Sequence, residues 1–178
     1  MILTGPEIAE QVRCGRIVID PFHSERIEPN SYGFSLSPHV MVYEDRVLDA
    51  RRAPAQRSIE LSEDGFVLEP RVLYLGSTVE RLGSLHYAAT LYACRSVSTM
   101  GMWIHYSAPL GHMGAIIPWT LEMQTTHPVV VYPNMLIGKI AFWATAGPSD
   151  RYSGRYRDSQ TTVGSRLADD DFGGRGAQ

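Results

Sequence analysis

A single carboxylate, Glu122, lies inside the apolar run 119–123, which otherwise has the composition of a buried strand. A carboxylate in such a run loses part of its hydration, so its protonated form becomes easier to reach near neutral pH. That property suits a group that passes protons to and from a substrate. Alternate residues of a strand face opposite ways, and the pattern alone favours a second interpretation, in which Glu122 lies on the solvent face.

Two further stretches carry polar groups that could contact a ligand. Arg95 and Ser96, followed by Ser98, form a compact set of cationic and hydroxyl donors that could hold phosphate oxygens, or could simply form a polar turn at the end of a strand. His112 stands between glycines in the run 111–114, where a turn would let the backbone approach a ligand closely. His112 is a candidate acid–base group, although a single loop histidine is more often a surface residue.

The segment 152–160 interleaves aromatic and cationic side chains near the C-terminal end. Tyrosines can stack on a planar ligand and arginines can neutralise phosphate, so this segment could fold over an anionic aromatic ligand. It could equally be a short basic tail that docks on a neighbouring subunit. We expect residues 1–148 to form the folded domain and residues 149–178 to form a tail. The end of this tail, which comprises the Asp169-Asp170-Asp171 run and the glycine-rich residues after it, is expected to be disordered.

The sequence lacks the combination of motifs by which zinc-dependent nucleobase deaminases bind their metal. Those enzymes pair a His-x-Glu with Pro-Cys-x-x-Cys, whereas the two cysteines here, Cys14 and Cys94, lie eighty positions apart. The histidines show neither His-x-His nor His-Glu-x-x-His spacing, so we assign no metal site. Any deamination by this chain must therefore activate its water without a protein-bound zinc.

Composition predicts one globular domain rather than a membrane or nucleic-acid-binding protein. The 178 residues are 44% hydrophobic and 20% charged, which allows a real core. The formal net charge of −3 offers no broad positive surface for a nucleic acid polymer. No apolar run is long enough to cross a bilayer, and the start of the chain lacks the pattern of a signal peptide. With two widely separated cysteines, a cytoplasmic location is expected.

The elements that must position these residues are mainly strands. A short helix is expected at the N-terminus, because Thr4 and Glu7 have capping-box spacing and Gly15 is a natural helix stop. Short β-type runs separated by Pro, Gly, Asn and Asp follow, which is typical of an all-β sandwich or closed barrel. The expected strands are 16–19, 32–36, 40–43, 66–68, 73–75, 89–93, 103–106, 119–123, 129–132 and 136–143.

Taken in order, several segments resemble the dCTP deaminase branch of the trimeric dUTPase superfamily over about residues 1–167. These segments are Gly15-Arg16-Ile17-Val18-Ile19-Asp20-Pro21-Phe22, Ile27-Glu28-Pro29-Asn30-Ser31-Tyr32, Phe66-x-Leu68-x-Pro70, Thr78-Val79-Glu80, Arg95-Ser96, the Glu122 strand, Pro133-Asn134-Met135-Leu136-Ile137-Gly138 and Tyr152-Ser153-Gly154-Arg155-Tyr156. Each motif alone is weak, and their order makes the resemblance specific. It implies an all-β, distorted β-barrel of the dUTPase-like or β-clip type with a short N-terminal helix, assembled as a homotrimer with nucleotide sites at subunit interfaces.

The resemblance also implies an activity, the zinc-independent hydrolytic deamination of a cytosine nucleotide. Glu122 would be the catalytic proton shuttle while water attacks C4 of the base, with Ser96 beside it and Arg95 on the phosphates. Magnesium would accompany the phosphates of the nucleotide rather than occupy a protein cage. The other candidate substrate-binding residues are Ser98, Ala108, Leu110, His112, Tyr152, Arg155, Tyr156 and Gln160.

This sequence departs from the family's pattern at several of these positions. The family's second Ser aligns with Val97, its second Arg has no counterpart, and Leu110 and His112 stand where the family has Arg and Asp. Losing guanidinium groups removes donors and fixed positive charge, and a histidine cannot copy a carboxylate's acceptor role. The substrate could therefore be a monophosphate, a ribonucleotide or a modified cytosine nucleotide instead of dCTP. Two alternatives stay open: a catalytically inactive nucleotide-binding or regulatory paralogue and, less favoured, a nucleotide pyrophosphatase.

Overall fold

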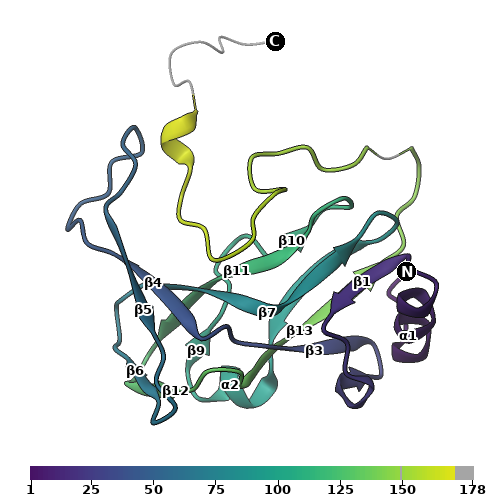
Figure 1. Cartoon of the computed structure of the whole chain (residues 1–178), viewed down its shortest axis with the longest axis horizontal. Coiled ribbons are helices and arrows are strands. Elements are labelled where there is room, and N and C mark those ends of the chain that lie inside the picture. The colour runs from purple at the N-terminus through teal and green to yellow at the C-terminus, as the bar shows by residue number, and fades with distance from the viewer. Residues whose placement is uncertain (149, 171–178) are drawn as a thin grey trace.

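The computed structural model describes residues 1–148 and 150–170, and these residues are mainly β. Most strands belong to a six-stranded and a five-stranded sheet, and a two-stranded sheet completes the set (Figure 1). In the described part of the chain these sheets do not close into one continuous barrel. The predicted all-β class with a short N-terminal helix is confirmed.

The six-stranded sheet positions Glu122. Its strands run in the order β5-β4-β7-β11-β9, and β1 pairs with the end of β7. The register opposes Glu122 to Leu75, and it shifts between Pro118 and Thr120, where the proline has no N–H to donate. The bounds are β1 (Ile17–Asp20), β4 (His39–Tyr43), β5 (Gln56–Glu60), β7 (Tyr74–Ser84), β9 (Met102–Trp103) and β11 (Ile116–Thr125).

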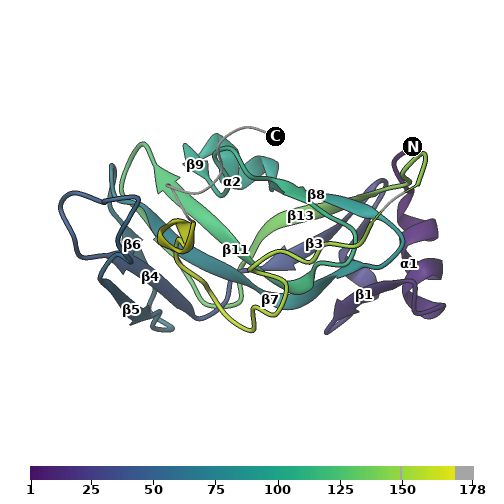
Figure 2. The ribbon, with the colours of Figure 1, turned by 90° about the horizontal axis from the view of Figure 1, so that it is seen from above.

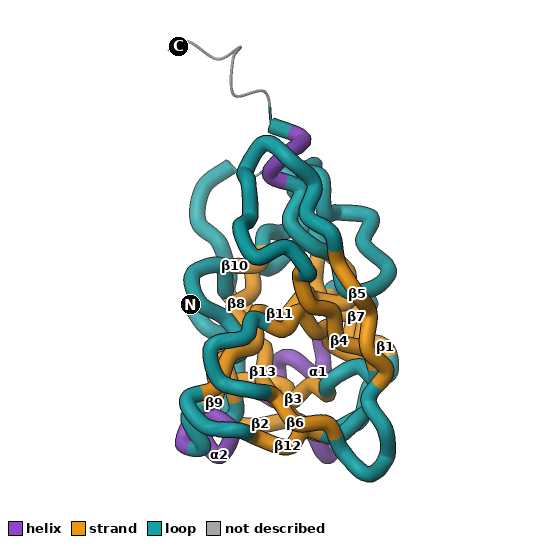
Figure 3. Tube along the Cα trace, turned by 90° about the vertical axis from the view of Figure 1, so that its left-hand side faces the viewer, coloured by secondary structure: helices purple, strands orange, loops and turns teal. Residues whose placement is uncertain are grey.

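The five-stranded sheet forms the second layer and runs in the order β10-β8-β13-β3-β2. Figure 3 shows it beside the first layer, with β8 and β13 on one side and β4 and β7 on the other. Large side chains buried between them include Tyr32, Phe34, Leu82, Leu121 and Phe142. The remaining strands are β2 (Ile27–Glu28), β3 (Ser31–Ser35), β6 (Phe66–Leu68), β8 (Ala88–Ala93), β10 (Leu110–Gly111), β12 (Val129–Val131) and β13 (Leu136–Trp143).

The N-terminal helix α1 (Gly5–Arg13) forms as predicted, and Gly15 follows it with a φ of +69°. The predicted capping box is wrong: the Thr4 side chain makes no capping hydrogen bond. The Glu7 carboxylate instead accepts a hydrogen bond from Gln11 Nε2 at 2.7 Å. Three shorter helices complete the described elements: η1 (Ser24–Arg26), α2 (Arg95–Thr99) and η2 (Leu167–Asp169).

None of the helices in residues 1–148 and 150–170 has the length and apolar character needed to span a membrane.

A buried ion pair joins η1 to the central strand β7. The side chain of Glu80 is fully buried and its Oε1 contacts the Arg26 guanidinium. Its Oε2 accepts a hydrogen bond from the backbone N–H of Ser35 at 2.9 Å. Glu80 therefore holds three segments together, and the one ion pair that it makes with the described residues is with Arg26, whose side chain is only 26% exposed.

Candidate active site

A cavity of about 530 Å³ lies against β11 and contains Glu122. We call it the Glu122 cavity. Strands β4, β7, β10 and β11 contribute to its wall together with the loops before and after β10. Leu73, which precedes β7, and the tail segment 150–170 supply the rest. The tail residues that line the cavity are Tyr152, Tyr156, Ser159, Val163, Gly164 and Ser165.

Strand alternation places Glu122 in this cavity. Its neighbours Leu121 and Met123 are fully buried in the core, so the Glu122 side chain points to the opposite face of β11. That face is the wall of the cavity, where the Glu122 residue is partly buried. Its Oε2 accepts a hydrogen bond from the backbone N–H of Tyr106 at 3.0 Å. This hydrogen bond orients the carboxylate.

His105 lies in the same cavity, and sequence analysis gave it no role. Neither ring nitrogen has a hydrogen-bond partner among the described protein atoms. Burial lowers the pKa of His105, while the negative charge of Glu122 acts in the opposite direction. The imidazole is therefore neutral at physiological pH, with one donor and one acceptor for a ligand. His105 is recognised only in the structure, because its burial and its lack of hydrogen-bond partners cannot be seen in the sequence.

Replacing His105 by Gln is expected to make the protein's stability less sensitive to acid. Because burial lowers the pKa of His105, the unfolded chain binds a proton there more readily than the folded protein. The stabilisation is complete above the ordinary pKa of about 6.5 and is lost as the pH falls through the lowered value. Melting temperatures of both proteins across this range provide the test, since the other histidines are common to both. Parallel curves would contradict the assignment.

Five of the other predicted substrate-binding residues do line the Glu122 cavity. The imidazole of His112 stacks on the ring of Tyr152, with centroids 5.6 Å apart and planes 15° from parallel. The backbone N–H of Tyr152 donates to the carbonyl of Met113 at 2.7 Å, which fixes the start of the tail on this loop. The five residues are Ala108, Leu110, His112, Tyr152 and Tyr156.

The tail continues across the cavity of its own chain. The N–H of Val163 donates to Thr120 Oγ1 at 3.2 Å, and the N–H of Ser165 donates to the hydroxyl of Tyr43 at 2.7 Å. Figure 2 shows this segment passing over β7 and β11 before it reaches η2. Residues 150–170 of the tail thus form one wall of the Glu122 cavity. Of the end predicted to be disordered, Asp169 and Asp170 are ion-paired with Arg166 and Arg155, and residues 171–178 lie outside the described residues.

The remaining predicted site residues lie elsewhere. Arg95, Ser96 and Ser98 are exposed on α2, and none of them lines the Glu122 cavity of its own chain. Gln160 lines a second cavity, of about 460 Å³, together with residues of β4 and β7. Arg155 does not line the Glu122 cavity but makes contacts within the tail. A single chain therefore brings the candidate proton-transfer group, Glu122, to the cavity without the candidate phosphate-binding group, Arg95.

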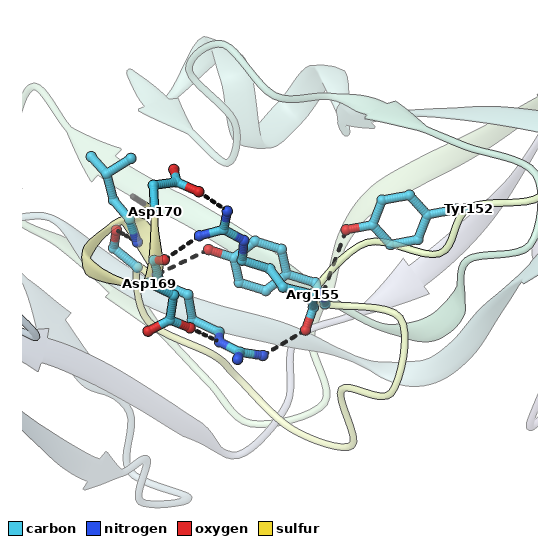
Figure 4. A network of polar contacts seen from close by, with 8 residues as sticks. Tyr152, Arg155, Asp169 and Asp170 are labelled. Carbon is cyan, nitrogen blue, oxygen red and sulfur yellow. Dashed lines mark hydrogen bonds and ion pairs between the residues drawn. The ribbon is translucent and has the colours of Figure 1, made fainter. Parts of the chain in front are cut away.

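Figure 4 shows the polar contacts that Arg155 and its neighbours in the tail make. The Arg155 guanidinium contacts the Asp170 carboxylate and the carbonyl of Arg166. In return, Arg166 donates to Asp169 Oδ2 at 2.8 Å and to the carbonyl of Arg155 at 2.6 Å. The hydroxyl of Tyr156 accepts the N–H of Arg166 at 3.0 Å. These contacts fold the end of the tail back on itself beside the cavity.

Among the described residues, no three or more His, Cys, Asp or Glu side chains lie close enough together to hold a metal ion. Glu122 is the one carboxylate that lines the Glu122 cavity in residues 1–148 and 150–170, and no described lining residue is Arg or Lys. Independence from a protein-bound metal stays a prediction from the sequence.

Comparison with known proteins identifies the family. The sequence model of the dCTP deaminase-like family matches residues 2–145. A Clostridium beijerinckii protein named "dCTP deaminase, dUMP-forming" is 38% identical over 161 residues, which cover 90% of this chain and 92% of the relative. A Rhodopirellula baltica protein named "dCTP deaminase" is 37% identical over 161 residues, covering 89% of this chain and 80% of the relative.

A solved structure is similar in fold. It is the 2'-deoxycytidine 5'-triphosphate deaminase from Agrobacterium tumefaciens, with a TM-score of 0.64 and 17% sequence identity. The match covers 81% of this chain and 48% of the other, so this chain spans about half the length of that protein. The likeness supports the predicted dUTPase-like β fold. With the family match over residues 2–145 and relatives above 30% identity, the chain belongs to the dCTP deaminase-like family.

Proposed function

We propose that the protein hydrolytically deaminates a cytosine nucleotide and uses Glu122 to move the protons. The observation that carries this proposal is the position of Glu122, partly buried in a ligand-sized cavity and oriented by the backbone N–H of Tyr106. The names of the relatives, which include dCTP deaminase, support the substrate class. The two free thiols, Cys14 and Cys94, agree with a reducing cytoplasmic setting.

The reaction requires two proton transfers that one carboxylate can perform. Water adds to C4 of the cytosine ring while Glu122 accepts a proton from it and delivers this proton to the ring nitrogen N3. Glu122 then moves the second proton of the water to the exocyclic amine. The C4–N bond breaks, ammonia leaves, and the oxygen from water remains as the C4 carbonyl of uracil.

Other groups of the cavity support these steps. The indole of Trp119 is held by a hydrogen bond from Nε1 to the carbonyl of Leu82 at 3.0 Å, so it forms a fixed aromatic wall. The neutral ring of His105 offers a donor or acceptor to the base. The tail covers the cavity and limits access of bulk water to the reacting atoms.

We infer that the protein acts as a homotrimer in which α2 of one subunit completes the cavity of the next. Arg95 and Ser96 are exposed and lie outside their own chain's cavity. Met100, Trp103 and Tyr106, all about half exposed, form an apolar surface that leads from α2 to the loop beside Glu122. An interface across this surface would bury apolar area and supply one guanidinium and one hydroxyl to each site.

Subunit mixing tests this arrangement. With a cytosine nucleotide as substrate, the Arg95→Ala and Glu122→Gln proteins should each be nearly inactive, because each lacks one half of every site. After unfolding and joint refolding at equal amounts, about a quarter of the sites should combine an intact Glu122 with an intact Arg95 from a neighbour. Activity of the mixture well above that of either protein alone is the expected result. A mixture no more active than its components would contradict the shared site.

The activity itself is tested by following ammonia and uracil products from a panel of cytosine nucleosides and nucleotides, with and without magnesium and with a zinc chelator. We expect chelation of zinc to leave the rate unchanged, and magnesium to act only through the substrate's phosphates. Nucleotide binding without turnover would show the regulatory paralogue instead, and release of pyrophosphate alone would show a pyrophosphatase.

A further inference from the structure

The charge of the Glu122 cavity is unusual for a site that would hold a polyphosphate. Its described lining contains the carboxylate of Glu122 and no arginine or lysine. Of the two lining histidines, His105 is buried without partners, and this burial lowers its pKa and so disfavours its charged form, while His112 is stacked on Tyr152. A phosphate chain placed here would lose hydration beside a carboxylate without a compensating charge.

The tail brings no net positive charge to the cavity. Residues 150–170 contain four arginines and four aspartates. Arg151 is exposed and does not line the cavity. The other three arginines of this segment are ion-paired with its own aspartates, Arg155 with Asp170, Arg157 with Asp158 and Arg166 with Asp169. A polyphosphate would have to displace these carboxylates before Arg155, Arg157 or Arg166 could bind it.

The rest of the wall suits a neutral ligand. Tyr43, Trp119 and Tyr152 offer aromatic faces, and Leu110 and Ile117 offer aliphatic ones. Such a surface packs against a planar base and a pentose ring, for which burial in an aromatic and aliphatic pocket is favourable. The hydroxyl of Ser159 adds a polar contact for a sugar hydroxyl.

We propose that this chain deaminates a cytosine nucleoside that carries at most one phosphate, and that it discriminates against the triphosphate. The proposal rests on the proposed deaminase function. A single guanidinium, Arg95 of a neighbouring subunit, can bind one phosphate in a bidentate manner but cannot neutralise three. The relatives named above are named for dCTP, so this chain would differ from them in the phosphate number of its substrate.

The test compares kcat/KM for deoxycytidine, dCMP and dCTP with the wild-type protein. We expect dCTP to be about tenfold or more below the better of the other two substrates. Deamination that depends on Glu122 but favours dCTP would overturn this inference and leave the proposed function standing. Failure to deaminate any of the three, or their ribose counterparts, would overturn the proposed function itself.

A charge insertion provides the second test. Leu110 lines the Glu122 cavity and is 56% exposed, so the substitution Leu110→Arg would place a guanidinium beside the cavity. We expect the ratio of kcat/KM for dCTP to that for dCMP to rise about tenfold. Leu48→Arg is the matched control, because Leu48 is 52% exposed and does not line the cavity. If the Leu110→Arg protein folds and the ratio is unchanged, the charge argument is overturned. If this variant does not fold, the comparison of the three substrates with the wild-type protein still tests the proposal.

Discussion

Replacing Glu122 by Gln is expected to lower the kcat for deamination by about 10²–10⁴-fold, since an amide cannot accept and return protons. The substitution preserves size, and the Gln carbonyl can still accept the hydrogen bond from the N–H of Tyr106. The cavity should therefore keep its shape. The measurement is the steady-state rate of ammonia release together with the ligand-induced rise in melting temperature, which should remain.

Glu60→Gln is the matched control for this experiment. Glu60 lies at the end of β5, is exposed and does not line the Glu122 cavity. The control removes the same charge from the same type of side chain, so its kcat should stay at the wild-type level. Turnover of Glu122→Gln protein close to wild type would show that another group moves the protons.

Replacing Arg26 by Met is expected to lower the free energy of unfolding by about 3–5 kcal/mol, because it leaves the fully buried carboxylate of Glu80 without its counter-charge. The methionine fills part of the space of the arginine stem, so the loss reports mainly the uncompensated charge. Chemical denaturation at neutral pH measures the difference. Because the ion pair connects η1 to β7, the loss should appear in the global unfolding transition.

Arg57→Met is the control for the buried ion pair. Arg57 pairs with Glu44 at 3.5 Å, and both side chains are more than half exposed, so its loss should change stability by about 0.5 kcal/mol or less. A double variant, Arg26→Met with Glu80→Gln, should recover part of the lost stability because the buried charge is gone. Equal small effects of Arg26→Met and Arg57→Met would contradict the account.

The two carboxylates show what sequence could and could not predict. Glu122 stands out because the residues around it are apolar, and that pattern led to the strand and to the candidate site. Glu80 stands among polar residues, Ser77 and Thr78, so the sequence predicts only a short strand at 73–75 where β7 extends over Tyr74–Ser84. Both polar residues are buried, and the Thr78 hydroxyl donates to the carbonyl of Glu80 and accepts the N–H of Trp119, which periodicity cannot reveal.

The tail shows a second limit. Its interleaved tyrosines and arginines predict ligand contact for both residue types. In the structure Tyr152 and Tyr156 line the cavity, whereas Arg155 contacts Asp170 and Arg166. Composition could not show this division, because Asp170, which competes for Arg155, comes close to it only after the chain turns through η2. Arg95 shows a related limit, because spacing does not reveal that its exposed side chain lies outside the Glu122 cavity of its own chain.

The most direct test of the central claim follows the oxygen atom. The wild-type protein and the Glu122→Gln variant are incubated with the best cytosine substrate in ¹⁸O-labelled water, and the uracil product is analysed by mass spectrometry. If water attacks C4 and Glu122 is the proton shuttle, the wild-type protein should give one heavy oxygen at C4 for each ammonia released. The variant should form almost no labelled product in the same time. A product without the label, or equal labelled product from both proteins, would contradict the mechanism.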